Sequence, residues 1–249
     1  MTELYYFALS FFVYGFLGWC TEVAYAAAKQ GKFVNRGFLN GPICPVYGIG
    51  VGVVVQFLTP VENNLVLLYI SSTILVTVIE GITGFLLEKI FHNKWWDYSE
   101  QPLNIGGYVC VLFSLIWGVF CVLIVKIIHP LIYKVLTMIP LVLGIVVMAC
   151  LAVGLLADLY VTASGILKMN RRLEAMEKIA AELKELSDKV GENIYENVME
   201  GMEFREEKKA RIEELKAKYE EMAENRTKVG ERLVKAFPKM QVGQHKEIF

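Results

Sequence analysis

Three stretches of this chain are almost free of charged side chains, and they constrain its fold more than any other feature. Residues 4–28 contain a single charge, Glu22, while residues 104–125 and 139–157 contain none. A helix needs about 20 mostly apolar residues to cross the hydrocarbon layer of a membrane. Helices and closed barrels are the structures that satisfy every backbone polar group there. The chain is therefore expected to be an all-α, polytopic membrane protein.

The composition of the chain changes near residue 168. Its mean hydropathy is +0.44 and 55% of its residues are hydrophobic, yet 20% are charged, and most of the charged side chains follow Asn170. A chain that combines these extremes has a membrane part and a water-soluble part. We therefore expect a transmembrane helical domain over residues 1–165 and a cytoplasmic helical or coiled-coil tail over residues 166–249.

Five segments are candidates for crossing the membrane: residues 4–28, 43–59, 65–88, 107–128 and 135–165. The first has no basic start and no small-residue cleavage site, so we expect a retained span and not a signal peptide. The second is short and contains Pro45 and three glycines, so it either spans the membrane or is re-entrant.

The distribution of basic side chains favours about five spans in a helical bundle. Five crossings leave only Lys126 and Lys134 on one side of the membrane and place the other basic residues near span ends on the opposite side. Because cytoplasmic loops carry an excess of Lys and Arg, the prediction is a multi-pass cell-membrane protein with its N-terminus outside and its C-terminus in the cytoplasm. The residues on the basic side are Lys29, Lys32, Arg36, Lys89, Lys94, Lys168, Arg171 and Arg172.

Two polar sequences lie beside the apolar segments. The first polar loop (residues 35–48) reads Asn-Arg-Gly-Phe-Leu-Asn-Gly-Pro-Ile-Cys-Pro-Val-Tyr-Gly, and the second polar loop (residues 95–108) holds Trp-Trp-Asp-Tyr-Ser followed by Asn-Ile-Gly-Gly-Tyr. Charged side chains and irregular backbone are costly at membrane depth unless they line a cavity walled by protein. Function is therefore expected at these two loops.

Acidic side chains also occur inside the apolar segments, where a charge costs ~3 kcal/mol or more unless it is paired or hydrated. Glu22, Glu88 and Asp158 lie near the expected cytoplasmic ends of their spans, and Glu80 lies about 12 Å deeper than Glu88 on the same helix face. We expect these groups and the polar loops to form a ligand or ion site. The alternative is a web of salt bridges, with Arg36 paired to Glu22 or Glu88, that only fixes helix register. The candidate site residues are Glu22, Asn35, Arg36, Asn40, Glu80, Glu88, Asp97, Asn104 and Asp158.

Arg36 is the first candidate for ligand contact. An arginine fork beside the backbone N–H groups of a glycine-containing loop suits a phosphate or a carboxylate. In the second polar loop, Trp95, Trp96 and Tyr98 are typical of an interfacial aromatic belt, whereas Asp97 between them is a candidate polar anchor or proton acceptor.

Several classes of function are not expected. A net charge of −1 without a block of Lys and Arg argues against nucleic-acid binding. The chain has no P-loop, no Gly-x-Ser-x-Gly elbow and no His-Glu-x-x-His helix, so it does not resemble an NTPase, an α/β-hydrolase or a metalloprotease. Its three histidines are isolated and its five cysteines form no Cys-x-x-Cys pair, so neither a metal site nor a cofactor is expected. If ATP is used, a separate ATPase subunit must supply it.

The spans also carry stripes of small residues at helical spacing, such as Gly15 and Gly18 in the first and Gly48 and Gly52 in the second. Small residues let helix backbones approach closely in lipid. The stripes therefore predict packing seams between helices.

The tail has the composition of long helices, because residues 166–237 are rich in Ala, Glu, Lys, Leu and Arg. Two amphipathic stretches, with a break expected between Gly191 and Gly201, predict either a helical hairpin or a dimeric coiled coil. Either would be an interaction element for a cytoplasmic protein partner or a second copy of the chain; the alternative is a solvated helix pair that only covers its own membrane domain. The expected stripes are Leu173, Met176, Ala180, Leu183, Ser187 and Val190, and then Ile212, Leu215, Tyr219, Met222, Arg226, Val229 and Leu233.

The motifs resemble a known family. Gly18-Trp19-x-x-Glu22, the first polar loop, Glu80 with Glu88-Lys89, and Trp96-Asp97-Tyr98 with Asn104-x-x-Gly107 are similar to the bacterial family described as putative ABC-transporter permease, CmpB-type. The resemblance covers about residues 5–165 and leaves the tail outside. It implies an integral protein of the bacterial cell membrane that takes part in transport, with a separate ATPase subunit.

Three functions remain open at this level. The first is a permease or transport component with a polar site near the cytoplasmic leaflet, in which the carboxylates bind a cation or proton and Arg36 is the counter-charge. The second is an intramembrane enzyme that acts on a lipid or isoprenoid headgroup, with Arg36 on the phosphate and Glu22, Asp97 or Glu88 as general base. The third is a membrane scaffold or sensor that recruits a partner through its tail. Membrane lipids are expected neighbours in each case, and the motifs do not decide whether the protein is an enzyme.

Overall fold

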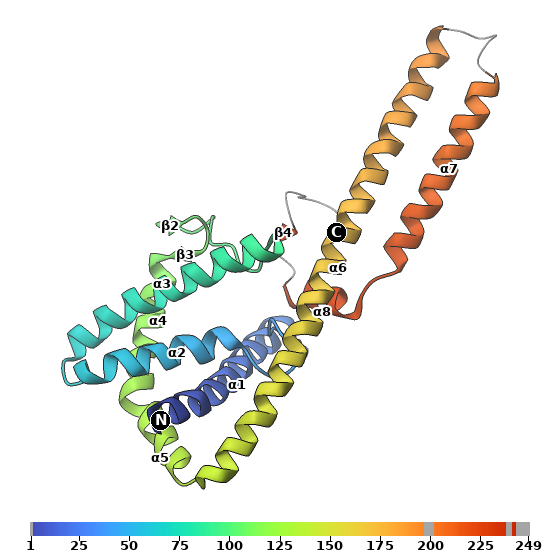
Figure 1. Ribbon diagram of the computed structural model, residues 1–249. Helices are drawn as coiled ribbons and strands as arrows, with labels where there is room; N and C mark the ends of the chain where they lie inside the picture. The colour runs from blue at the N-terminus through green and yellow to red at the C-terminus, as the bar shows by residue number, and fades with distance from the viewer. Residues whose placement is uncertain (1, 197–201, 238–240, 243–249) are drawn as a thin grey trace. The chain divides into compact units, whose positions relative to one another are not determined.

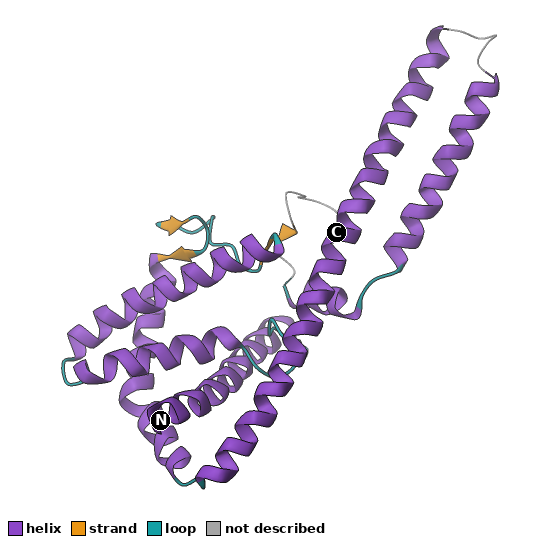
Figure 2. Cartoon of the chain, viewed as in Figure 1, coloured by secondary structure: helices purple, strands orange, loops and turns teal. Residues whose placement is uncertain are grey.

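The computed structural model describes residues 2–196, 202–237 and 241–242, and nearly all of them are helical (Figure 2). Four helical segments are long and apolar enough to cross a membrane: Glu3–Gln30, Leu65–Phe91, Val111–Thr137 and Leu141–Lys189. A shorter apolar helix covers Pro45–Val61. The predicted class, an all-α membrane protein, is confirmed.

The chain forms two compact units, each of which is described by itself. The first unit comprises residues 1–163 and 232–249, and the second comprises residues 164–231. Helix α6 (Leu141–Glu196) starts in the first unit and ends in the second. Helix α8 (Lys228–Ala236) starts in the second unit and ends in the first.

In the first unit, helix α1 (Thr2–Gln30) packs against α2 (Pro45–Leu58), and α3 (Leu65–Phe91) packs against α4 (Val111–Leu123) (Figure 1). Helix α2 also contacts α3 and continues into the short 3-10 helix η1 (Thr59–Val61). Pro45 starts α2, a position where its missing N–H costs no helical hydrogen bond. Asn64 caps α3 by accepting a hydrogen bond from the backbone N–H of Leu67 at 3.1 Å.

The segment after α3 differs in its boundaries from the sequence expectation of a span over 107–128. A hairpin of two short strands, β2 (Asn104–Ile105) and β3 (Val109–Cys110), occupies its start, with Gly106 and Gly107 at φ values of 61° and 73° in the turn. Helix α4 then continues through a π-helical turn, η2 (Ile124–Ile128), into α5 (His129–Thr137). Lys126 and Lys134 therefore lie within one helical segment.

Glycines bring α1 and α2 into close contact, as the stripe of small residues predicts. A Cβ atom on Gly18 would lie 2.3 Å from Cγ of Tyr47, and one on Gly48 would lie 2.5 Å from the backbone oxygen of Phe11. In α6 the glycines differ from one another: a Cβ on Gly144 would overlap the hydroxyl of Tyr5, whereas nothing lies within 4 Å of a Cβ built on Gly154.

In the second unit, α6 and α7 (Met202–Glu224) run antiparallel (Figure 1). Leu173, Met176, Ile179 and Leu215 are buried in it. The inward face of α6 includes Ile179, whereas Ala180 and Ser187 are exposed, so the face differs from the predicted stripe at those two positions. Helix α6 continues through Gly191 to Glu196; the rest of the expected break, including Gly201, lies outside the described residues.

Candidate functional site

Glu22 on α1 forms the first part of the site. One of its carboxylate oxygens lies 3.3 Å from Nε of Arg36, and the other accepts a hydrogen bond from the hydroxyl of Tyr47 on α2 at 2.8 Å. The guanidinium of Arg36 also lies over the ring of Tyr25, 5.2 Å from its centroid. Arg36 is thus the counter-charge of Glu22, one of the two ion pairs that the sequence suggested.

Glu80 on α3 forms the second part. Its Oε1 accepts a hydrogen bond from the hydroxyl of Tyr98 at 3.2 Å. Its Oε2 is buried and has no hydrogen-bond partner among the described residues. A buried carboxylate oxygen without a partner is costly, so it marks a place where a cation, a proton or water is favoured.

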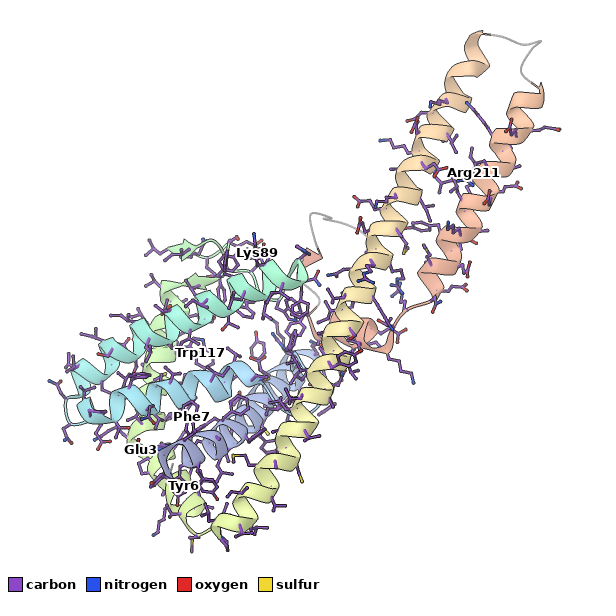
Figure 3. The ribbon with its side chains drawn as sticks, viewed as in Figure 1. Glu3, Tyr6, Phe7, Lys89, Trp117 and Arg211 are labelled. Carbon is purple, nitrogen blue, oxygen red and sulfur yellow. The ribbon has the colours of Figure 1, made fainter. Side chains whose placement is uncertain are left out.

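These two glutamate–tyrosine pairs lie close together. Tyr47 packs against Trp117 with ring centroids 5.8 Å apart, and Tyr98 stacks on Phe113 at 5.0 Å. Phe113 and Trp117 are four residues apart on α4 and therefore share one of its faces; Figure 3 labels Trp117 beside α2 and α3. We call Glu22, Tyr47, Glu80 and Tyr98 the Glu–Tyr cluster.

The electrostatics of Tyr98 connect the two pairs. Burial raises the pKa of Tyr98, and the negative charges of Glu80 and Glu22 raise the same pKa further. Tyr98 therefore stays protonated, and its O–H remains a hydrogen-bond donor to Glu80.

A third glutamate–tyrosine pair lies nearer the end of α3. Burial raises the pKa of Tyr108, and the carboxylate of Glu88 nearby raises that pKa further. The Oε2 atom of Glu88 is buried without a hydrogen-bond partner among the described residues, as in Glu80. Glu88 lies eight residues, about 12 Å, along the helix from Glu80.

Asp97 and Asn104 organise the second polar loop. Oδ1 of Asp97 accepts hydrogen bonds from the backbone N–H and the hydroxyl of Ser99 and lies 3.0 Å from Nζ of Lys94. Asn104 donates to the backbone oxygens of Ser99 and Gln101 and accepts from the N–H of Gly107. Burial alone would raise the pKa of Asp97, but the bonds from Ser99 and Lys94 outweigh it and hold that pKa below 3.8.

Asn35 and Asn40 shape the first polar loop. Oδ1 of Asn35 accepts hydrogen bonds from the indole N–H of Trp19 at 2.7 Å and from the backbone N–H of Gly37 at 3.0 Å. The side-chain amide of Asn35 donates to the backbone oxygen of Asn40 at 2.7 Å. The loop is closed on itself by this bond.

Asp158 on α6 binds the same loop. Its Oδ1 accepts from both the backbone N–H and the side-chain amide of Asn40, at 3.1 and 2.8 Å, and its Oδ2 accepts from the N–H of Gly41 at 2.6 Å. The hydroxyl of Thr162 donates to Oδ1 as well. Asp158 thus accepts four hydrogen bonds, three of them from the first polar loop. None of the four involves a residue of the Glu–Tyr cluster.

Two kinds of residue at the site were not predicted from the sequence. The tyrosines that accompany the glutamates stand inside the polar motifs, at Tyr47, Tyr98 and Tyr108, and their apolar rings hid their role as donors. Arg232 on α8, which donates to the first polar loop, gave no signal, because it lies in an amphipathic stretch with many charges.

The polar loops contact each other through aromatic rings. Phe38 lies 5.5 Å from Trp95 and 5.6 Å from Phe91, measured between ring centroids. Among the described residues, no three His, Cys, Asp or Glu side chains come together as metal ligands. The polar groups that the Glu–Tyr cluster brings together are carboxylate and phenol oxygens.

Comparison with known proteins places the chain in a family. Residues 9–163 match the family model described as Putative ABC-transporter type IV. The matched region holds every residue of the Glu–Tyr cluster and both polar loops, and it ends before the second unit. Neither a curated protein nor a solved structure gives a match to the chain. Because the match covers more than half of its length, the chain belongs to the Putative ABC-transporter type IV family.

Proposed function

We propose that the protein is the membrane permease component of a transport system, and that the Glu–Tyr cluster binds a small cation or a proton near the cytoplasmic leaflet. A separate ATPase subunit is the partner that this family suggests. The proposal rests on one observation: Oε2 of Glu80 is buried and has no hydrogen-bond partner in the described structure.

The position of Glu80 supports a role beyond packing. It lies 15 residues from the start of α3 and 11 from its end, about 22 Å and 16 Å along the helix axis. A charge at such depth in an apolar helix is expensive and is typically retained for a pathway, a proton relay or a ligand. Glu80 is therefore placed where an ion in transit would need a negatively charged oxygen.

The charge balance of the cluster favours a cation over an anion. Glu22 is neutralised by Arg36, whereas the described residues form no salt bridge with Glu80. One negative charge therefore remains to be balanced, either by a proton or by a bound cation. The phenol oxygen of Tyr98, 3.2 Å from Oε1 of Glu80, adds an uncharged ligand beside it.

The alternative of an enzyme on a lipid headgroup receives less support from the geometry. That function needs Arg36 available to a phosphate, but Arg36 is held by the carboxylate of Glu22 and lies over the rings of Tyr25 and Phe237. The scaffold alternative requires every buried charge to be paired, and Glu80 does not meet that requirement.

The test is cation-dependent thermal stability of the purified protein in mild detergent, measured for the wild type and for Glu80→Gln. A ligand at 100 times its Kd stabilises the folded state by about 2.7 kcal/mol. We expect one monovalent or divalent cation, or a fall in pH, to raise Tm in the wild type and to have no effect on Tm in Glu80→Gln.

Glu100→Gln is the matched control, because Glu100 is an exposed carboxylate of the second polar loop. It should keep the wild-type response. A series of cations that leaves the wild-type Tm unchanged, or that shifts Glu80→Gln equally, would contradict the proposal. A positive result is followed in proteoliposomes by uptake of the same ion.

A further inference from the structure

We propose that residues 232–237, at the end of α8 and just beyond it, form a strap that holds the first polar loop closed over Glu22 and Arg36. That the strap regulates the Glu–Tyr cluster rests on the proposed function, whereas the closure itself does not. The strap lies outside the region matched by the family model, which ends at residue 163.

Arg232 is the main contact of the strap. Its guanidinium donates to the backbone oxygen of Gly37 at 2.7 Å, to that of Phe38 at 2.8 Å and to Oδ1 of Asn40 at 3.0 Å. Burial lowers the pKa of Arg232, and the charge of Asp158 opposes that shift. A planar guanidinium with three acceptors in one loop fixes the path of that loop.

The rest of the strap covers Arg36. Phe237 lies under the guanidinium of Arg36, 5.6 Å from its carbon to the ring centroid. Ala236 is fully buried with Ala26 and Val34, on either side of the turn that leaves α1, and Phe237 packs against them. The strap therefore contacts both the backbone of the loop and Arg36, the arginine that pairs with Glu22.

The first polar loop depends on these contacts. In the described structure its backbone makes few hydrogen bonds within the loop, such as Ile43 N–H to the oxygen of Gly41 at 2.9 Å, and Cys44 N–H donates to the oxygen of Gly15 on α1 at the same distance. Asp158 supplies acceptors for its N–H groups, and Arg232 supplies donors for its carbonyls. Opposite charges thus hold complementary backbone groups of one loop.

The course of the chain gives the strap a regulatory position. Asp158 and Thr162 precede the second unit in sequence, and Arg232 follows it directly. In sequence, both ends of residues 164–231 therefore adjoin residues that hold the loop. The backbone of strand β4 (Gln241–Val242) also pairs with β1 (Asn93–Lys94), which precedes the second polar loop.

Cys44 reports on the closure. Its thiol is buried, and it lies in the first polar loop six residues after Phe38, the residue whose carbonyl Arg232 holds. In a protein whose only cysteine is Cys44, with Cys20, Cys110, Cys121 and Cys150 replaced by Ser or Ala, the rate of alkylation by a small maleimide measures opening of the loop.

We expect Arg232→Gln to raise that rate at least about tenfold, a change of about 1.4 kcal/mol in the opening equilibrium. Phe237→Ala should raise it less, since it leaves the hydrogen bonds to the loop in place. Arg211→Gln, which removes an exposed arginine of the second unit, is the matched control and should leave the rate unchanged. An unchanged rate in Arg232→Gln would overturn the proposal.

Two further measurements separate the strap from other effects. If Arg232→Gln lowers Tm by many degrees, its alkylation rate cannot be compared with that of the wild type. Hydrogen exchange of the backbone N–H groups of residues 37–41 is then measured in Phe237→Ala. Exchange no faster than in the wild type would overturn the proposal that the strap holds the loop. Glu80→Gln should lose the response to cations while Cys44 stays as slow to react as in the wild type. A failure of the proposed function would therefore leave the evidence for the strap intact.

Discussion

Tyrosine side chains accompany three glutamates of α1 and α3. Glu22 and Glu80 each accept a hydrogen bond from a tyrosine in another part of the chain, and Glu88 lies near enough to Tyr108 to raise the pKa of that tyrosine. A hydrogen bond to a carboxylate is stronger than one between neutral groups. The pairing stabilises a charge in an apolar setting while leaving one oxygen of Glu80 and of Glu88 without a hydrogen-bond partner in the described structure.

At this scale Tyr98→Phe tests the pairing. It removes the hydrogen bond that Glu80 accepts while keeping the ring against Phe113, so we expect a loss of about 1–3 kcal/mol in unfolding free energy. Combined with Glu80→Gln, the loss should be smaller than the sum of the single changes. Thermal unfolding in detergent measures it, and Tyr160→Phe, at a residue that is 75% exposed, is the control. Additive losses would contradict the pairing.

The charge of Asp97 predicts a pH dependence of the second polar loop. A carboxyl group whose pKa is depressed on folding stabilises the fold above its unfolded value and loses that contribution as pH falls through the folded value. We therefore expect the loop to loosen only below about pH 3.8. Hydrogen exchange of residues 95–108 measures it, and Asp97→Asn should be loosened already at pH 6 with little change on acidification. Loosening of the wild-type loop near pH 6 would argue against this assignment.

At the scale of helices, close packing of α1 on α2 sets the position of Glu22 relative to Tyr47. Gly18 and Glu22 are four positions apart in sequence and therefore lie on one face of α1, and the ring of Tyr47 lies directly over Gly18. A side chain at Gly18 would displace the ring whose hydroxyl binds Glu22. The small residue is thus part of the site as well as of the helix contact.

Gly18→Ala should therefore lower the unfolding free energy by about 1–3 kcal/mol, because the added Cβ overpacks the contact with Tyr47. Gly154→Ala is the matched control, since a Cβ there meets nothing within 4 Å. It should be neutral or stabilising by up to about 1 kcal/mol through helix propensity. The measurement is thermal unfolding of both variants, and equal effects would show that the α1–α2 contact is not tight.

For the whole molecule, the role of α2 decides the topology. If α2 crosses the membrane with the four longer helical segments, the two ends of the chain lie on opposite sides; if it does not, they lie on the same side. We propose five crossings, because this places most of the basic residues near span ends on the cytoplasmic side.

Single cysteines at Thr2 and Ser187 test this topology in intact cells of a cysteine-free variant. A maleimide that cannot cross membranes should label Thr2→Cys directly and Ser187→Cys only after permeabilisation. The same response at both positions would show that α2 is re-entrant and that both ends face one side.

Much of the candidate site could be anticipated from motifs, because a buried charge or an irregular loop in an apolar chain is unusual wherever it folds. Glu22 with Arg36 was one of two suggested ion pairs. Asp158 and Asn40 were both expected near the ligand, but their mutual hydrogen bonds and the separation of Asp158 from the Glu–Tyr cluster were not visible in the spacing of the motifs.

The helical membrane class and the position of the polar loops could be predicted from the amino-acid sequence alone. Long stretches without charge must satisfy their backbone groups internally in lipid, and that requirement depends only on neighbouring residues. The contacts that define the site were decided by the tertiary structure, since Arg232 meets Asn40 across 192 residues and Asp158 meets it across 118. Periodicity records which face of a helix is apolar, but which faces and loops meet depends on how the whole chain packs.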